Sequence, residues 1–450
     1  MPARDTARPH PAARARPMPR FLLFCIFAIP FAPQGAGFYL GSGLPILDVP
    51  RMLVLILIAW WFLRRGITGR IRWAWNGVTV SLAVLVATQF LSAVATGEAG
   101  ALITWVGYVA YYYAIFVVVS TELRSYDDGR RVLDVVVVLA VALAALSCYE
   151  FLTQTDVYAN ARTAWEADPN ATLGPQYRHI GLLASSGPFA VNTLLGYFFA
   201  ATFFLVSSRL FSPDVRIPKI LGAVIVVMMV LGLFVTQVRA AIVAVLVTAI
   251  VPAVIMPRQL GKSLLVAALL IVTILTLGVT LIPRRYVYAD FVTNFYQNQT
   301  YRHNGVGPRL EAITAALEAL IRRPALGYGT GSVTRWMFVG SGFSPLNDLP
   351  VYLVVAMESG VAAGAAFVLL VGLSLRALWR RYRSDPDPRR RATVMGLFLS
   401  ILSYGIAILG APRLDSTFIF FVLLAVANSL RARPGERGAG RTLEPSPHAA

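Results

Sequence analysis

The sequence predicts an all-α, polytopic integral membrane protein with about twelve transmembrane helices. Three observations predict this class: the composition, the length of the apolar runs, and the distribution of basic residues. Of the 450 residues, 57% are hydrophobic and only 14% are charged, and the mean hydropathy is +0.65. These values are typical of membrane proteins with many spans rather than of soluble domains. The net charge of +18 does not indicate a nucleic-acid-binding protein, because the arginines separate hydrophobic segments instead of forming a basic domain.

A helix of about 20 apolar residues spans a bilayer, and apolar runs of about this length recur along the chain. They cover residues 21–40, 44–63, 74–95, 100–120, 131–152, 185–206, 217–236, 240–256, 263–283, 350–375, 392–411 and 415–430. The first run contains Pro30 and Pro33 and could alternatively be a signal peptide. The absence of a clean A-x-A cleavage site after it favours a retained helix.

Basic residues predict the orientation. Most of the 40 Lys and Arg residues fall in segments that are cytoplasmic if the N-terminus is inside, and the runs at 376–391 and 431–441 are the clearest. By the positive-inside rule, we expect both termini in the cytoplasm and a location in the cytoplasmic membrane. The basic runs then serve as topology signals and as contacts with anionic lipids.

The predicted organisation is a single membrane domain with two tails. Residues 1–20 form a basic cytoplasmic tail, residues 21–431 form the membrane domain, and residues 432–450 form a disordered cytoplasmic tail. Two long loops, 153–184 and 284–349, lie on the outer face. Cys25 and Cys148 both fall inside apolar runs, so neither a disulfide framework nor a thiolate metal site is expected.

The larger outer loop contains an amphipathic helix. Leu310, Ile313, Leu317, Leu320 and Ile321 recur at helical spacing and predict one apolar stripe. The helix ends at two arginines and a proline, and a flexible glycine-rich turn that allows close approach of the backbone follows. This element is either a surface helix on the membrane interface or a lid over an outer cavity.

Three arginines on the predicted outer face are the main candidate site residues. Arg239 lies in TQVRAA between two apolar runs, while Arg178 and Arg309 lie in the two long outer loops. An ionisable group at the edge of a bilayer core is costly, and by default it is a functional candidate. We expect the three guanidinium groups to converge on one cavity and bind an anionic lipid-linked substrate. Alternatively, Arg239 is a snorkelling anchor and the other two are solvated charges.

These segments resemble the O-antigen ligase and polysaccharide polymerase superfamily over roughly residues 175–375. That family has a T-x-S-R-x-A-like segment at a helix start, an R-x-x-G segment before a membrane helix, and an Arg-led loop helix running into P-x-x-G-x-G. A helix with Y-L and E-x-G follows. The T-x-S-R-x-A-like segment is matched by Thr236 to Ala241, with Arg239 as its arginine, and the R-x-x-G segment by Arg178 and Gly181. The loop helix is matched by Arg309, Pro324, Gly327 and Gly329. The helix after it is matched by Tyr352 and Leu353 for Y-L, by Glu358 and Gly360 for E-x-G, and by Gly364 as the small residue that follows.

The resemblance implies a GT-C-like glycosyltransferase that works without metal or cofactor at the outer face of the membrane. The donor would be a glycan on a polyprenyl diphosphate such as undecaprenyl diphosphate, and the acceptor would be a glycan or a lipid. A flippase or a chain-length regulator would be a partner. Ligases of this family carry a His-Asn pair where this chain has Leu349 and Pro350. Since polymerases more readily lack that histidine, the resemblance favours an exopolysaccharide-type polymerase.

Asp348 is the preferred candidate for the base that accepts the proton of the acceptor hydroxyl. It is equally suited to be the N-cap of the helix that follows. The resemblance adds Tyr352 and Glu358 to the substrate-binding set, although Glu358 could instead support the packing beside Gly360. No Asp, Glu or His cluster has the spacing of metal ligands.

Three other functions are compatible with parts of this pattern. A ligase would transfer a finished glycan from polyprenyl diphosphate to a lipid, protein or wall acceptor, and the arginines do not distinguish it from a polymerase. A flippase for lipid-linked oligosaccharide would be expected to have repeated halves and charges near the membrane midplane, which the sequence does not show. A structural scaffold would not need three outward-facing arginines.

Overall fold

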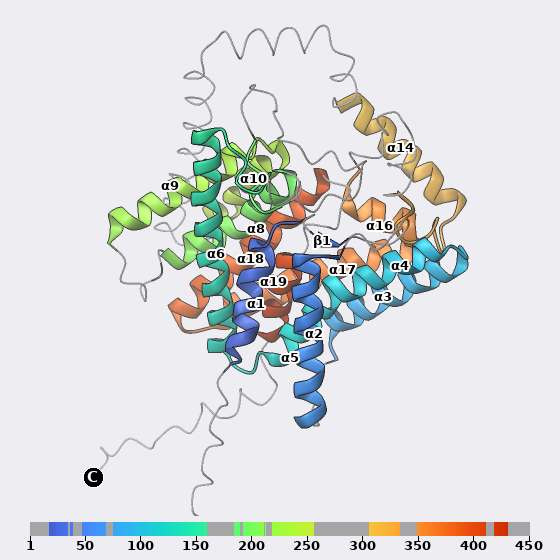
Figure 1. The fold of residues 1–450 in the computed structure, drawn as a ribbon, viewed down its shortest axis with the longest axis horizontal. Helices are drawn as coiled ribbons and strands as arrows, with labels where there is room; N and C mark the ends of the chain where they lie inside the picture. Colours follow the sequence, from blue (N-terminus) through green and yellow to red (C-terminus); the bar gives the residue numbers. More distant parts are fainter. Residues whose placement is uncertain are drawn as a thin grey trace, which may run out of the picture.

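The described part of the protein is a bundle of helices with one very short strand pair (Figure 1). This computed structural model describes residues 18–34, 37–38, 47–68, 75–159, 184–189, 192–210, 212, 218–255, 306–333, 349–410 and 418–430. The first half contains α1 (Arg20–Phe31), β1 (Gly37–Phe38), β2 (Leu47–Asp48), α2 (Val49–Thr68), α3 (Gly77–Ala95), α4 (Ala99–Tyr108), the π-helical turn η1 (Val109–Tyr113), α5 (Ala114–Glu122) and α6 (Tyr126–Thr153). The second half contains α8 (Asn192–Leu210), α9 (Lys219–Val235), α10 (Arg239–Ile255), α14 (Val306–Arg322), α16 (Val351–Ser359), α17 (Val361–Ser384), α18 (Pro388–Ala407), the 3-10 turn η3 (Ile408–Gly410) and α19 (Phe418–Ser429).

The predicted all-α membrane class is confirmed. Within the described ranges, 6 helices are long and apolar enough to cross a membrane, and four shorter apolar helices accompany them. The predicted run 263–283 lies outside the described residues, so the count of twelve spans and the GT-C-like architecture stay predictions.

Helix α8 forms the centre of the bundle. It is apolar on every side, and 83% of its membrane-length window is buried inside the protein, as expected of a helix surrounded by other helices. It packs against α6, α9, α10 and α18. The remaining helices extend this core, with α17 against α3 and α19 against α5.

Local sequence signals explain where several helices begin. The side chain of Asn76 caps α3 through the backbone N–H groups of Val78 and Thr79, and Ser125 caps α6 in a capping box with Asp128. Asp387 caps α18, where a proline at the first position has no N–H to satisfy.

Three features of the structure differ from the predicted series of simple spans. The run 350–375 is two helices, α16 and α17, because the chain breaks at Gly360. The run 100–120 contains η1, a π-turn that the sequence pattern did not indicate. Between α1 and α2, the two-residue strands β1 and β2 pair antiparallel, a feature that the all-α prediction omitted.

Candidate functional site

The break between α9 and α10 presents Arg239. Helix α9 ends at Val235, the chain turns through Gln237 with a left-handed φ of 57°, and Arg239 is the first residue of α10. The predicted split of the two apolar runs at this arginine is therefore confirmed, and its side chain is exposed. A cation at a helix N-terminus opposes the helix dipole, so Arg239 does not stabilise its own helix. The free N–H groups of that first turn attract anions, as the guanidinium does.

Neighbouring elements hold this break in place. The Asn192 side chain donates through Nδ2 to the Thr236 carbonyl at 2.7 Å, and the Ser185 N–H donates to the Val235 carbonyl at 3.1 Å. Helix α8 approaches so closely that a methyl group on Gly196 would lie 2.7 Å from Cβ of Val238. The position of Arg239 is therefore set by α8 and by the segment 184–189 that leads into it.

A buried carboxylate organises that segment. Glu150, near the end of α6, accepts hydrogen bonds from the Ser185 hydroxyl at 2.6 Å, the Gly187 N–H at 3.1 Å and the Val157 N–H at 3.2 Å. Val157 lies near the start of the predicted outer loop 153–184, and Ser185 and Gly187 follow its end, so Glu150 joins the two ends of the loop that carries Arg178. The sequence analysis missed Glu150, although a glutamate at the end of a long apolar run was a usable signal.

The break between α16 and α17 receives the glycine-rich turn that follows α14. The Tyr328 N–H donates to the Met357 carbonyl, the Gly329 N–H to the Glu358 carbonyl, and the Val361 N–H to the Pro324 carbonyl, each at 2.9 Å. The predicted close approach of this turn is confirmed. The predicted flexibility is not seen, because backbone hydrogen bonds hold the turn on both sides of the break.

Two glycines are required by this contact. Gly327 and Gly360 have φ values of 64° and 86°, where side chains are strained. A methyl group on Gly327 would lie 2.2 Å from the Met357 carbonyl oxygen, and one on Gly360 would lie 2.1 Å from the Ala325 carbonyl oxygen. The two backbones therefore approach as closely as glycine allows.

Polar side chains from α3 and η1 surround the same break. The Ser92 hydroxyl donates to the Glu358 carbonyl at 2.7 Å, and the Thr330 hydroxyl donates to the Gln89 carbonyl at 2.8 Å. The π-turn η1 carries Tyr113, whose hydroxyl donates to Oε1 of Gln89 at 2.7 Å. All five residues are buried, so this break is enclosed by hydrogen-bonded groups.

Helix α14 packs on α16 through small residues. Ala312 and Ala316 are buried against Leu349, Val354 and Met357. The five large apolar residues of the predicted stripe are not the ones buried against α16. Leu310, Leu317 and Ile321 are exposed, while Ile313 and Leu320 are partly buried, because small side chains let two helices approach more closely than large ones do.

Several predicted site residues lie outside what the structure describes. Arg178 and Asp348 fall outside the described residues, and Arg309 lies in the first turn of α14 with its side chain outside them. The convergence of the three arginines stays a prediction. The alternative N-cap role of Asp348 was wrong, because Pro350 occupies the N-cap position of α16.

The two residues added by the resemblance are placed by the structure. The partly buried Tyr352 donates its hydroxyl to the Gly405 carbonyl at 2.9 Å and so joins α16 to α18. Glu358 is fully buried at the end of α16. These positions favour packing roles over direct substrate contact for both residues.

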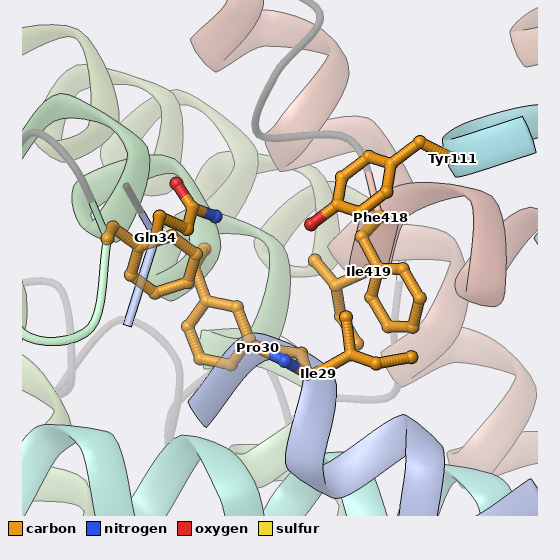
Figure 2. Close-up of a pocket in the computed structure, with 8 residues that line it drawn as sticks. Ile29, Pro30, Gln34, Tyr111, Phe418 and Ile419 are labelled. Carbon is orange, nitrogen blue, oxygen red and sulfur yellow. The ribbon is translucent and has the colours of Figure 1, made fainter. Parts of the chain in front are cut away.

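A small pocket lies between α1, η1, α8 and α19. Figure 2 shows Pro30 and Gln34 on one side and Tyr111 and Phe418 on the other. Its cavity of about 10 Å³ has room for roughly one water molecule, so it does not accommodate a sugar.

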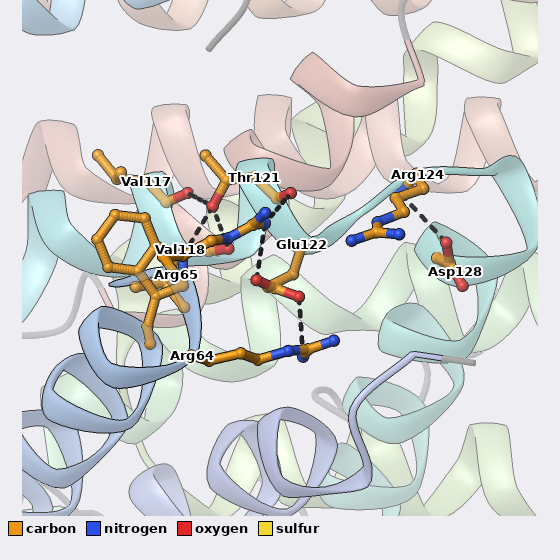
Figure 3. A network of polar contacts seen from close by, with 9 residues as sticks. Arg64, Arg65, Val117, Val118, Thr121, Glu122, Arg124 and Asp128 are labelled. Atoms are coloured by element: carbon orange, nitrogen blue, oxygen red, sulfur yellow. Dashed lines mark hydrogen bonds and ion pairs between the residues drawn. The ribbon is translucent and has the colours of Figure 1, made fainter. Parts of the chain in front are cut away.

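Several arginines elsewhere in the bundle are paired with acids. Where α2 and α5 end, Glu122 lies 3.1 Å from Nη1 of Arg64 and 2.7 Å from Nη2 of Arg65, and Arg65 also donates to the Thr121 carbonyl at 2.7 Å (Figure 3). Arg209 of α8 pairs with Asp134 of α6. The sequence analysis did not single out Arg64 and Arg65, and the structure shows that they join two helices.

Comparison with known families gives one match. Residues 224–367 match the family model described as O-Antigen ligase. The matched region contains Arg239, Arg309, Tyr352 and Glu358, and it excludes Arg178. No curated protein matches the chain.

Proposed function

We propose that this protein is a polysaccharide polymerase of the O-antigen ligase and polysaccharide polymerase superfamily. The matched region 224–367 and the motifs within it support this family. The protein would extend a glycan carried on polyprenyl diphosphate, at the outer face of the cytoplasmic membrane. The observation that carries the proposal is the exposed Arg239 at the N-terminus of α10, inside the matched region.

The reaction needs the chemistry that Arg239 offers. A hydroxyl oxygen of the acceptor sugar attacks the anomeric carbon of the donor, and the bond from that carbon to the diphosphate oxygen breaks. The polyprenyl diphosphate leaves with the electron pair, and the hydroxyl proton passes to a base. A guanidinium pairs with two phosphate oxygens at once and keeps its charge, so it stabilises the developing negative charge of the leaving group.

We assign the remaining roles by the same chemistry. Arg178 and Arg309 complete the diphosphate clamp with Arg239, and Asp348 accepts the hydroxyl proton. No metal ion is needed for these steps, because the three arginines supply the positive charge. Glu150 and the α9–α10 turn support this assignment, since they fix the ends of the segments from which Arg178 and Arg239 project.

A ligase is the second candidate, because the matched family model is described by that activity. One observation favours the polymerase. Leu349, at the position where family ligases carry histidine, is fully buried in the apolar cluster between α14 and α16, where it offers no proton acceptor.

The experiment is elongation in proteoliposomes that contain the full-length protein and a polyprenyl diphosphate oligosaccharide, with a metal chelator present. We expect wild type to produce a ladder of longer lipid-linked glycans. Arg239→Ala should be slower by about 10²–10³-fold, the typical cost of losing one electrostatic contact to the transition state. Arg383→Ala is the matched control, because Arg383 is an exposed arginine in the last turn of α17.

Each alternative gives a different product. A ligase transfers glycan only to an added acceptor and makes no ladder. A flippase moves the substrate across the bilayer and forms no glycosidic bond. Normal elongation by Arg239→Ala would reject the clamp.

A further inference from the structure

Helix α14 has three distinct faces. At about 100° per residue, Leu310, Leu317 and Ile321 fall within roughly 40° of one another. The buried Ala312 and Ala316, which contact α16, lie to one side of this stripe. On the other side is a polar face formed by Glu311, Glu318 and Arg322.

The apolar stripe is uncovered in the folded chain. The exposed fractions are 59% for Leu310, 46% for Leu317 and 77% for Ile321. Leu326, in the turn that follows the helix, is also 39% exposed. Exposed large apolar side chains in a contiguous row indicate a surface that meets lipid or protein.

The end of α14 adjoins a part of the protein that faces lipid. A methyl group on Gly329 would lie 2.6 Å from the side chain of Thr96, and one on Gly331 would lie 2.6 Å from that of Thr104. The turn after α14 therefore touches the connection between α3 and α4. Helix α3 is long and apolar enough to cross a membrane, as is the continuous helical stretch Ala99–Glu122 that α4 begins. The exposed apolar side chains of α3 and α4 are Val80, Val84, Phe90, Leu91, Val94, Leu102 and Val106.

The neighbouring surface of α3 and α4 favours lipid as the occupant of the stripe. The turn after α14 contacts these two helices, and their exposed apolar side chains need the same lipid surroundings as the stripe. The charged face then points to water. A protein partner that covered only the stripe would not account for the exposed apolar side chains of α3 and α4 beside it.

We propose that α14 is a membrane-interface helix whose Leu310, Leu317 and Ile321 side chains insert into the lipid surface beside α16. Amphipathic helices of this kind bury their apolar face about 5–10 Å into the boundary between headgroups and acyl chains. Because α14 also carries Arg309 in its first turn, the lipid surface fixes the height of that residue at the level of the headgroups.

The test uses the full-length protein with Cys25 and Cys148 replaced by alanine and one new cysteine carrying an environment-sensitive fluorophore. Leu317→Cys and Ile321→Cys report on the stripe, and Glu311→Cys and Glu318→Cys on the same helix are matched controls. The proteins are placed in vesicles of phosphatidylcholine and phosphatidylglycerol. We expect spin-labelled lipid to quench the stripe positions more strongly than the control positions, because the stripe would lie about 5–10 Å into the headgroup and acyl-chain boundary, and aqueous iodide to show the reverse order.

Two outcomes would overturn the proposal. Equal iodide quenching at all four positions would place the stripe in water. Protection of positions 317 and 321 from both quenchers would show that protein, such as a second copy of the chain, covers them. Because all four positions are exposed, labelling should leave the fold intact, and a melting profile equal to that of the unlabelled parent confirms this for each variant.

Discussion

The α9–α10 break and the α16–α17 break both lie beside η3, but one leaves a charged side chain exposed and the other is enclosed. Both α10 and α16 contact η3, and both breaks contain a residue with left-handed φ, Gln237 in one and Gly360 in the other. The α16–α17 break is enclosed by the glycine-rich turn and by buried polar side chains. The α9–α10 break leaves the next charged side chain, Arg239, exposed. We call the α16–α17 break the closed break, because its contacts hold the helices together. We call the α9–α10 break the open break, because it exposes a candidate substrate-binding side chain.

The largest expected effect comes from filling the closed break. Gly360→Ala combines a left-handed φ with an overlap at the Ala325 carbonyl, and together these should cost about 3 kcal/mol or more of folding free energy. Thermal unfolding of the purified protein in detergent measures the loss. Gly372→Ala in α17 is the matched control, because no atom lies within 4 Å of the added methyl group, and it should be neutral or slightly stabilising. Equal melting temperatures for the two variants would contradict the closed-break description.

An intermediate effect is expected beside the open break. Glu150→Ala leaves the donors of Ser185, Gly187 and Val157 without their acceptor, which should cost about 2–3 kcal/mol. It should also slow elongation, because Ser185 holds the carbonyl that precedes the Arg239 turn. Glu150→Gln keeps one acceptor oxygen and should lie between wild type and Glu150→Ala in melting temperature. Glu318→Ala, at an exposed position of α14, should change neither measurement.

The smallest effect tests a single bond of the closed break. Ser92→Ala removes one of two hydrogen bonds to the Glu358 carbonyl, and the Gly329 N–H remains. The expected loss is about 1 kcal/mol, seen as a small fall in melting temperature with elongation unchanged. A loss as large as that of Gly360→Ala would mean that side chains rather than backbone contacts hold the break together.

The sequence was most informative where a hydropathy pattern extends over many residues. The helical class and the split at Arg239 follow from hydropathy, and the structure has both, whereas the break at Gly360 inside the predicted run 350–375 was missed. The covered face of α14 could not be predicted from hydrophobicity, because Ala312 and Ala316 are buried for their small size. The π-turn at Tyr113 and the three donors to Glu150 depend on contacts between distant segments, which periodicity does not encode.

The ion pair between α2 and α5 has a consequence for how the chain is made. Arg65 and its partner Thr121 are 56 residues apart, and Glu122 follows directly. The predicted span 44–63 covers most of α2, so during synthesis we expect α2 to enter the bilayer before its carboxylate partner exists. We expect its two cationic groups to stay among lipid headgroups until α5 is inserted. The packing of α2 against α5 is then a late step of biogenesis, because it needs the Glu122 carboxylate at the end of α5.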